Sequence, residues 1–262
     1  MRSLNIGATG MLAQQTNVEV ISNNIANMNT TAYSRRRAEF HDLIYQNMRR
    51  VGSSSSDSGT IVPSGVQLGM GVKTAAVYRI SERGSMISTE NPLDLGIQGK
   101  GYFQIELPGG RGTAYTRDGS FQLSPEGELV THDGYVVMPG INVPDDATGI
   151  SVNQSGEVLV KIDGEAEQIN VGQIELATFP NEAGLEAVGD NLFIETPASG
   201  QGNVAAPGAA GYGTILQGFL EASNVNVVAE ITELVSAQRA YEMNSKVIQT
   251  SDQMMSTVNQ MK

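Results

Sequence analysis

The chain has 262 residues and no cysteine or tryptophan, and its 28 acidic and 16 basic side chains give a formal net charge of −12. The lack of cysteine excludes disulfides, thiolate catalysis and thiolate metal sites, and the acidic balance argues against a general nucleic-acid binder. No run of 18 apolar residues is present, and residues 1–13 lack the basic and apolar regions of a secretion signal, so we expect neither a membrane span nor a cleaved leader.

Residues 1–28 have the pattern of a helix with an apolar seam. Apolar side chains recur every seven residues in one row, which is Leu4, Met11, Val18 and Ile25. Ile21 belongs to a second row beside it. Only Arg2 and Glu19 are charged before residue 34. Because a solvent-facing helix normally carries charges on its outer face, this helix is predicted to contact protein on several sides.

Residues 31–71 are predicted to form an extended connecting segment. It begins with three consecutive arginines, Arg35 to Arg37, and residues 51–65 are rich in serine and glycine. Taken alone, this composition is typical of a flexible or extended loop.

From residue 72 to residue 222, short alternating apolar runs predict a β-rich domain. Turn pairs such as Asp133-Gly134 separate the runs, because glycine after aspartate accepts a positive φ. Many short strands at close spacing indicate an antiparallel arrangement, and the expected strands include Tyr135–Met138 and Ile169–Phe179. Residues 140–200 hold eleven acidic residues and one basic residue, which is either ordinary solvated surface or a docking face.

A second helical seam occupies the C-terminal region. Its apolar residues also recur every seven positions, and Ile231 widens the stripe; the row is Val227, Leu234, Tyr241, Ile248 and Met255. Asn226 has the chemistry of an N-cap, and a helix that runs from there to Met261 would be about 50 Å long at the usual rise per residue.

The two seams are predicted to pair as an antiparallel or staggered coiled coil that brings the termini together. The expected fold class is α+β, with a discontinuous helical core domain (1–30 and 223–262), the connecting segment (31–71) and a β-rich outer domain (72–222). Because two helices alone bury little apolar surface, we expect them to be ordered only when other copies cover them. A repeated contact that does not close a ring builds a helical filament, so the residues of both seams are the predicted self-assembly residues.

Motifs for catalysis, cofactor binding and metal binding are lacking. The two histidines, His41 and His132, stand far apart in the sequence, which disfavours a zinc site, and no carboxylate pair is marked as catalytic. Gly99 and Gly101 are not followed by the third glycine and helix of a nucleotide-binding loop. On the residues alone, a secreted β-rich hydrolase and an adhesin stay open as remote alternatives, although an adhesin more usually exposes tryptophan.

Several motifs resemble those of the bacterial flagellar rod and hook proteins. The N-terminal ones are Asn23-Asn24-Ile25-Ala26-Asn27 and the run from Arg35 through Arg37 to Phe40. The C-terminal ones are Asn224-Val225-Asn226 and Gln238-Arg239-Ala240-Tyr241. Residues 99–103 and 115–121 resemble motifs of the family's β domain. Together these motifs cover both ends of the chain and part of its middle, and the chain is identified as a member of this family.

Within the family, the segment from Tyr45 to Gly71, which includes Pro63 and Gly65, resembles the distal-rod branch. The resemblance implies that this segment is an ordered extension that contacts neighbouring subunits. Ser34 stands where lysine is frequent, and Ala32 stands where the family often has glycine. A positive φ at that alanine would strain the backbone.

The resemblance further implies a structural, non-enzymatic subunit without a cofactor or metal. The flagellar type III apparatus would export it without a cleaved signal, and it would polymerise into a hollow helical drive shaft whose bore is lined by the terminal helices. That shaft would transmit torque from motor to hook within a basal body that spans the periplasm to the outer membrane. The implied partners are other copies of the chain, proximal rod proteins below, hook protein above and P and L ring bushing proteins outside, with no nucleic acid and no membrane insertion. A proximal rod or hook subunit is the alternative within the same family.

Overall fold

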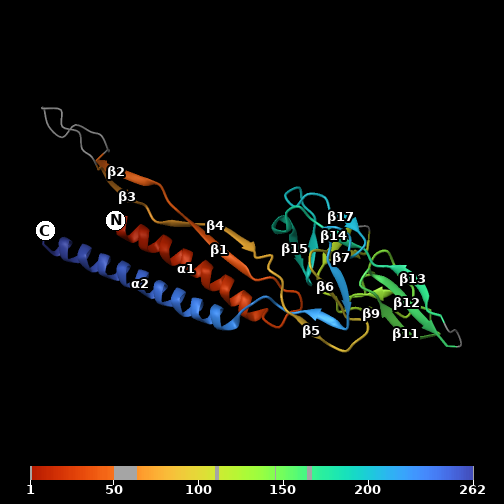
Figure 1. Ribbon diagram of the computed structural model, residues 1–262. Helices are drawn as coiled ribbons and strands as arrows, with labels where there is room; N and C mark the ends of the chain where they lie inside the picture. The colour runs from red at the N-terminus through yellow and green to blue at the C-terminus, as the bar shows by residue number, and fades with distance from the viewer. Residues whose placement is uncertain (1, 50–63, 110–111, 145, 164–166, 262) are drawn as a thin grey trace. The chain divides into compact units, whose positions relative to one another are not determined.

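The computed structural model describes residues 2–49, 64–109, 112–144, 146–163 and 167–261 (Figure 1). The chain divides into two compact units. The helical unit comprises Met1–Ala26, Arg36–Arg79 and Asn226–Lys262, and the β unit comprises Asn27–Arg35 and Ile80–Val225. The predicted α+β class is confirmed, because two terminal helices flank a middle region of antiparallel strands.

The helical unit is built on two long antiparallel helices, α1 (Arg2–Ala26) and α2 (Val227–Gln260), which lie side by side, with the start of α1 and the end of α2 at the same end of the pair (Figure 1). A β-ribbon accompanies them. In the ribbon β1 (Arg36–Asp42) pairs with β4 (Val72–Arg79), and β2 (Tyr45–Arg49) pairs with β3 (Val66–Gly69). The β1–β4 part lies against α1, where the backbone N–H of Val72 donates to Thr9 Oγ1 over 3.4 Å.

The boundaries of the two units differ from the expected domain boundaries. We expected Val72–Arg79 to open the β domain, but it pairs with β1 across the full register from Arg36↔Arg79 to Asp42↔Val72. Alternating side chains identify a strand without identifying its partner, which explains the difference. Conversely, residues 27–35 belong to the β unit, where the backbone N–H of Ala32 donates to Glu221 O over 2.8 Å.

In the described part of the β unit there is one six-stranded sheet with several smaller ones, and the strand pairs found there are all antiparallel. The large sheet has the order β15-β16-β8-β7-β14-β17, a second has the order β11-β12-β13, and β18-β6, β19-β5 and β10-β9 form pairs. The strands are β5 (Met86–Ser88), β6 (Leu95–Gln98), β7 (Tyr102–Glu106), β8 (Thr113–Thr116), β9 (Gln122–Leu123), β10 (Leu129–Val130), β11 (Ala147–Val152), β12 (Glu157–Ile162), β13 (Ile169–Gln173), β14 (Leu176–Thr178), β15 (Glu186–Gly189), β16 (Leu192–Ile194), β17 (Asn203–Ala205), β18 (Thr214–Gln217) and β19 (Phe219–Glu221), with a short 3₁₀ turn at Glu182–Gly184.

Two of the expected strands have a different form. The run 169–179 is split into β13, which pairs with β12, and β14, which pairs with β7 and β17. Between them the N–H of Ile174 donates to Gly156 O over 2.8 Å, so the chain passes from one sheet to another within the stretch that was expected to be a single strand. The run 135–138 makes only isolated bridges, Val130↔Val136 and Ile105↔Val137.

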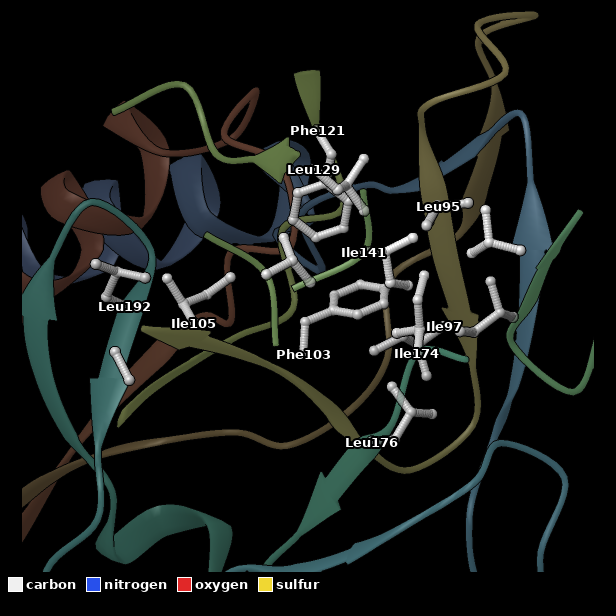
Figure 2. Packing of buried hydrophobic residues seen from close by; sticks show 14 residues of the cluster. Leu95, Ile97, Phe103, Ile105, Phe121, Leu129, Ile141, Ile174, Leu176 and Leu192 are labelled. Atoms are coloured by element: carbon white, nitrogen blue, oxygen red, sulfur yellow. The ribbon is translucent and has the colours of Figure 1, made fainter. Parts of the chain in front are cut away.

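The hydrophobic core of the β unit lies between these sheets (Figure 2). At its centre the rings of Phe103 and Phe121 meet edge to face, with centroids 5.0 Å apart. Phe103, Ile105 and Leu176 are fully buried. Such burial stabilises a fold by about 1.5–3 kcal/mol for each large apolar side chain, so the β unit has a core of its own.

Candidate assembly site

Close packing between α1 and α2 depends on two glycines of α1. A Cβ atom at Gly7 would lie 2.9 Å from Ile248 Cγ1, and one at Gly10 would lie 2.8 Å from Asn244 Nδ2. The helices therefore approach each other at points where any larger residue meets the partner helix. Gly7 stands in the same seven-residue row as Ile21. A glycine interrupts the apolar pattern of such a row, so the sequence did not predict that Gly7 contacts α2.

Asn24 joins three elements at the other end of the helix pair. Its side chain is 1% exposed, and its Nδ2 donates to Arg36 O over 2.9 Å and to Glu230 Oε2 over 3.1 Å. In return, the N–H of Arg36 donates to Asn24 Oδ1 over 2.8 Å. One buried amide thus ties α1 to β1 and to α2.

Glu230 is 4% exposed in the first turn of α2. The helix dipole favours a negative charge at this position, and the hydrogen bond from Asn24 satisfies one carboxylate oxygen. Asn226 caps the helix as predicted, because its Oδ1 accepts from the N–H of Ala229 over 3.2 Å. The N-terminus of α2 therefore combines a capping amide with a buried acid.

The helix pair covers only part of the predicted self-assembly residues. In α1, Ile21 is 2% exposed and the four residues of the main row are half-buried: Leu4, Met11, Val18 and Ile25. In α2, three seam residues are half-buried, namely Val227, Leu234 and Ile248, whereas Ile231, Tyr241 and Met255 are 48%, 43% and 38% exposed. Further apolar residues are exposed on α2 and at its C-cap: Val228, Val235, Met243, Val247, Met254, Val258 and Met261. We call these residues, with the three exposed seam residues, the α2 stripe.

The motif residues at the two ends have different surroundings. Asn224 holds the β unit together, since its Oδ1 accepts from the N–H of Arg35 over 2.7 Å and its Nδ2 donates to Glu82 O over 2.8 Å. Asn23, Arg37, Gln238 and Arg239 are exposed residues, and Asn27, Phe40 and Gly65 are half-buried. Pro63 lies outside the described residues.

The motif 115–121 supports the fold of the β unit. Arg117 is 4% exposed, its Nη2 lies 2.6 Å from Glu221 Oε2, and Glu221 Oε1 accepts from the N–H of Gly84 over 3.0 Å. Burial lowers the pKa of Arg117, and the charge of Glu221 opposes that shift. Glu221 is distant in sequence, and no spacing rule pointed to it.

Ala32 adopts the left-handed conformation, with a φ of +54°. The departure from glycine at this position therefore strains the backbone, as expected.

Neither described helix is long and apolar enough to cross a membrane. Among the side chains that the structure describes, no three of the histidine or carboxylate type are grouped so as to hold a metal ion.

Three family models match the chain, in the order in which its parts occur. They are the flagella basal body rod protein model at residues 4–33, the flagellar hook protein FlgE/F/G D1 domain model at residues 96–160, and the flagellar basal body rod FlgEFG protein C-terminal model at residues 216–261. The first and third models cover most of α1 and α2, and the second begins at β6 and ends in β12. Paired terminal helices around a β unit thus match the structural subunits of the flagellar axis.

Curated relatives match along the whole chain. Proteins named flagellar basal-body rod protein FlgG are 59% identical in Caulobacter vibrioides, over all of both chains, and 52% identical in Agrobacterium fabrum, over 99% of this chain and 98% of the relative. The protein of the same name in Borreliella burgdorferi is 48% identical, over 100% of this chain and 99% of the relative. The chain belongs to the FlgG family of flagellar basal-body rod proteins, and it is a structural subunit of the flagellar rod.

Proposed function

We propose that this chain builds the distal part of the rod by polymerising head to tail into a hollow helical shaft that transmits torque from motor to hook. Helices α1 and α2 line the tube, and the β unit faces outward. Its neighbours along the axis are proximal rod proteins and hook protein, and the P and L ring bushing surrounds it. Its role is mechanical, without catalysis, and it reaches the periplasm through the flagellar type III apparatus.

The observation that carries this proposal is the uncovered α2 stripe. Tyr241 and Met255 belong to the seven-residue row of α2 and Ile231 lies beside it, yet each of the three is more than a third exposed in the single chain. So many exposed apolar side chains on one helix mark a protein contact. Other copies of the chain supply the cover in the polymer.

The distribution of charge supports the inside-to-outside order. By sequence, the residues of the helical unit carry ten basic and eight acidic side chains, whereas those of the β unit carry six basic and twenty acidic ones. A nearly neutral helical unit suits close packing of many copies, because like charges would repel along the tube. An acidic β unit suits the solvated outside of the shaft.

The connecting segment offers a second contact surface. Ile44 is 82% exposed, and two residues of β2, Tyr45 and Met48, are 54% and 60% exposed. Apolar side chains that remain open on a two-stranded ribbon favour packing against a neighbouring subunit, as expected of an extension that stiffens the rod.

The test is assembly of purified full-length chain carrying a charge in the α2 stripe. Ile231→Asp leaves the single chain as folded as the wild type, because this residue is already 48% exposed. The variant forms no polymers in electron micrographs, because a charge is buried in the subunit contact. Leu234→Asp has the same effect on assembly and leaves the β unit folded. Ser155→Asp, which adds the same charge to an exposed turn of the β unit, assembles normally.

Basal bodies from a strain that lacks this chain test the position in the rod. A short proximal stub without the outer part of the shaft or the hook is the expected result. A complete rod that lacks only its hook would assign the chain to the hook. Normal rods and hooks would contradict the assembly role and reopen the hydrolase and adhesin alternatives.

A further inference from the structure

A groove runs between α1 and α2 near their middle. Its volume is about 480 Å³, and it is lined by Gln15, Val18, Glu19, Gln238, Tyr241 and Glu242. The groove lies wholly within the helical unit, since α1 contributes the first three residues and α2 the others.

The lining has the chemistry of a guanidinium pocket. Two carboxylates, Glu19 and Glu242, border the groove together with the ring of Tyr241, which is 43% exposed. Gln15 Nε2 donates to Glu19 Oε1 over 3.0 Å. In the described part of the chain, no basic side chain lies within ion-pair distance of either carboxylate. An arginine can bind carboxylates with its fork of donors and stack on an aromatic ring.

The β1–β4 ribbon of the same unit exposes such an arginine. Along β1, Ala38 and Phe40 are half-buried on the face toward α1, whereas Arg37, Glu39 and His41 alternate with them and are exposed. The carboxylate of Glu39 is occupied, because it accepts from the hydroxyl of Tyr78 over 2.9 Å. Among the described residues, no carboxylate lies within ion-pair distance of Arg37.

Groove and ribbon face are different surfaces of one unit and have complementary charges. Among the described residues Arg37 forms no ion pair with Glu19 or Glu242 within one chain. A contact between two different surfaces of identical copies is heterologous, and it continues from copy to copy without using up either surface. That is the geometry a helical polymer requires.

We propose that the α1–α2 groove of one copy binds the outer face of the β1–β4 ribbon of a second copy, with Arg37 seated between Glu19 and Glu242 against Tyr241. This inference rests on the proposed polymerisation and specifies one of its contacts. The charges make the contact specific, because opposite charges fix the register of an interface, whereas like charges that face each other in a wrong register destabilise it.

The test is charge reversal with rescue, using purified full-length chain. Glu242→Arg and Arg37→Glu each raise the critical concentration for polymerisation about tenfold, because each places like charges in the contact. The double variant Glu242→Arg/Arg37→Glu restores the pair with its polarity reversed and returns the critical concentration to near the wild-type value. Sedimentation measures the polymer fraction, and circular dichroism of the dilute chain checks that each variant has the helix content of the wild type at the same concentration.

Two matched controls separate this contact from a general effect of charge. Glu233→Arg is the control for Glu242→Arg, because it makes the same charge change at an exposed residue of α2 outside the groove lining. Arg36→Glu is the control for Arg37→Glu, because it makes the same charge change on the opposite face of β1. Both are expected to assemble like the wild type. Reversals that raise the critical concentration without rescue in the double variant would mean that the groove takes another occupant, and the proposal would be overturned. Reversals with no effect would overturn it as well, whereas Ile231→Asp still reports on assembly itself.

Discussion

The side-chain amide of Asn24 and the carboxylate of Glu230 share a buried hydrogen bond of 3.1 Å, although 206 positions separate them in the sequence. This bond connects the C-terminal end of α1 to the first turn of α2, and the second donor of the amide reaches the backbone of β1 at Arg36. The N-terminal and C-terminal helices are thus held together by a polar contact as well as by apolar packing. Buried polar groups of this kind specify one arrangement because every alternative leaves them unpaired.

Replacing Asn24 by alanine is expected to destabilise the helical unit by about 2–3 kcal/mol, because the Arg36 N–H and a Glu230 oxygen lose their partner. Denaturant unfolding followed by the helical circular dichroism signal measures this loss. Ser22→Ala, an exposed substitution in the same turn of α1, serves as the control and is expected to change stability by less than about 0.5 kcal/mol. Equal losses for both variants would contradict the role of the buried amide.

Placing leucine at Gly7 is expected to push α1 away from Ile248. Overpacking costs about 1–3 kcal/mol, and the removal of a helical glycine returns up to about 1 kcal/mol, so a net loss of about 1–2 kcal/mol should appear in the thermal unfolding of the helices. Asn5→Leu adds the same side chain at an exposed position of α1 and should cost nothing. A Gly7→Leu variant as stable as the wild type would mean that the helices do not need this close approach.

Restoring glycine at position 32 is expected to stabilise the β unit by about 0.5–1 kcal/mol. An alanine at positive φ costs about 1–2 kcal/mol, which the glycine variant avoids. The greater conformational freedom of glycine in the unfolded chain offsets about 0.5–1 kcal/mol of that stabilisation. Tyrosine fluorescence during denaturation measures the change. Ala187→Gly, at an exposed position of β15, should instead lower stability by about 0.5–1 kcal/mol.

Removing Arg117 leaves the carboxylate of Glu221 buried without its cation. Arg117→Met is therefore expected to destabilise the β unit by about 3–5 kcal/mol, while Arg117→Met/Glu221→Gln recovers part of the loss because no charge remains buried. Arg83→Met, which breaks a partly buried ion pair of 2.9 Å with Glu182, should cost less than Arg117→Met, about 1–2 kcal/mol, because these side chains are 26% and 16% exposed. If Arg117→Met were as stable as Arg117→Met/Glu221→Gln, the unpaired charge of Glu221 would not be the cause of the loss.

Burial raises the pKa of Tyr115, and the nearby charge of Glu195 raises it further. As the pH rises above about 10, this tyrosine ionises in the unfolded chain before it ionises in the folded one. The folded state then binds more protons than the unfolded state, so the stability contributed at lower pH is lost as the pH rises through the folded pKa. The free energy of unfolding should fall less steeply above pH about 10 in Tyr115→Phe than in the wild type.

Local features of the sequence were enough to predict the helices, the antiparallel β region and the family. A seven-residue apolar repeat marks a helix whatever it packs against, and Asn226 caps α2 through a contact only three residues away. Strain at Ala32 was predictable because an alanine, unlike a glycine, disfavours the positive φ that this position has. Each of these inferences depends on neighbours in the chain or on the properties of one residue type.

Only the tertiary structure decided which segments meet. It assigned β4 to β1, divided residues 169–179 between two sheets, set Gly7 against Ile248 and buried Arg117 beside Glu221. These contacts join residues far apart in the chain, and their energies depend on shape and burial that no local pattern contains. The exposed α2 stripe follows from the same cause, since spacing predicts an apolar face and only packing determines how much of it a single chain can cover.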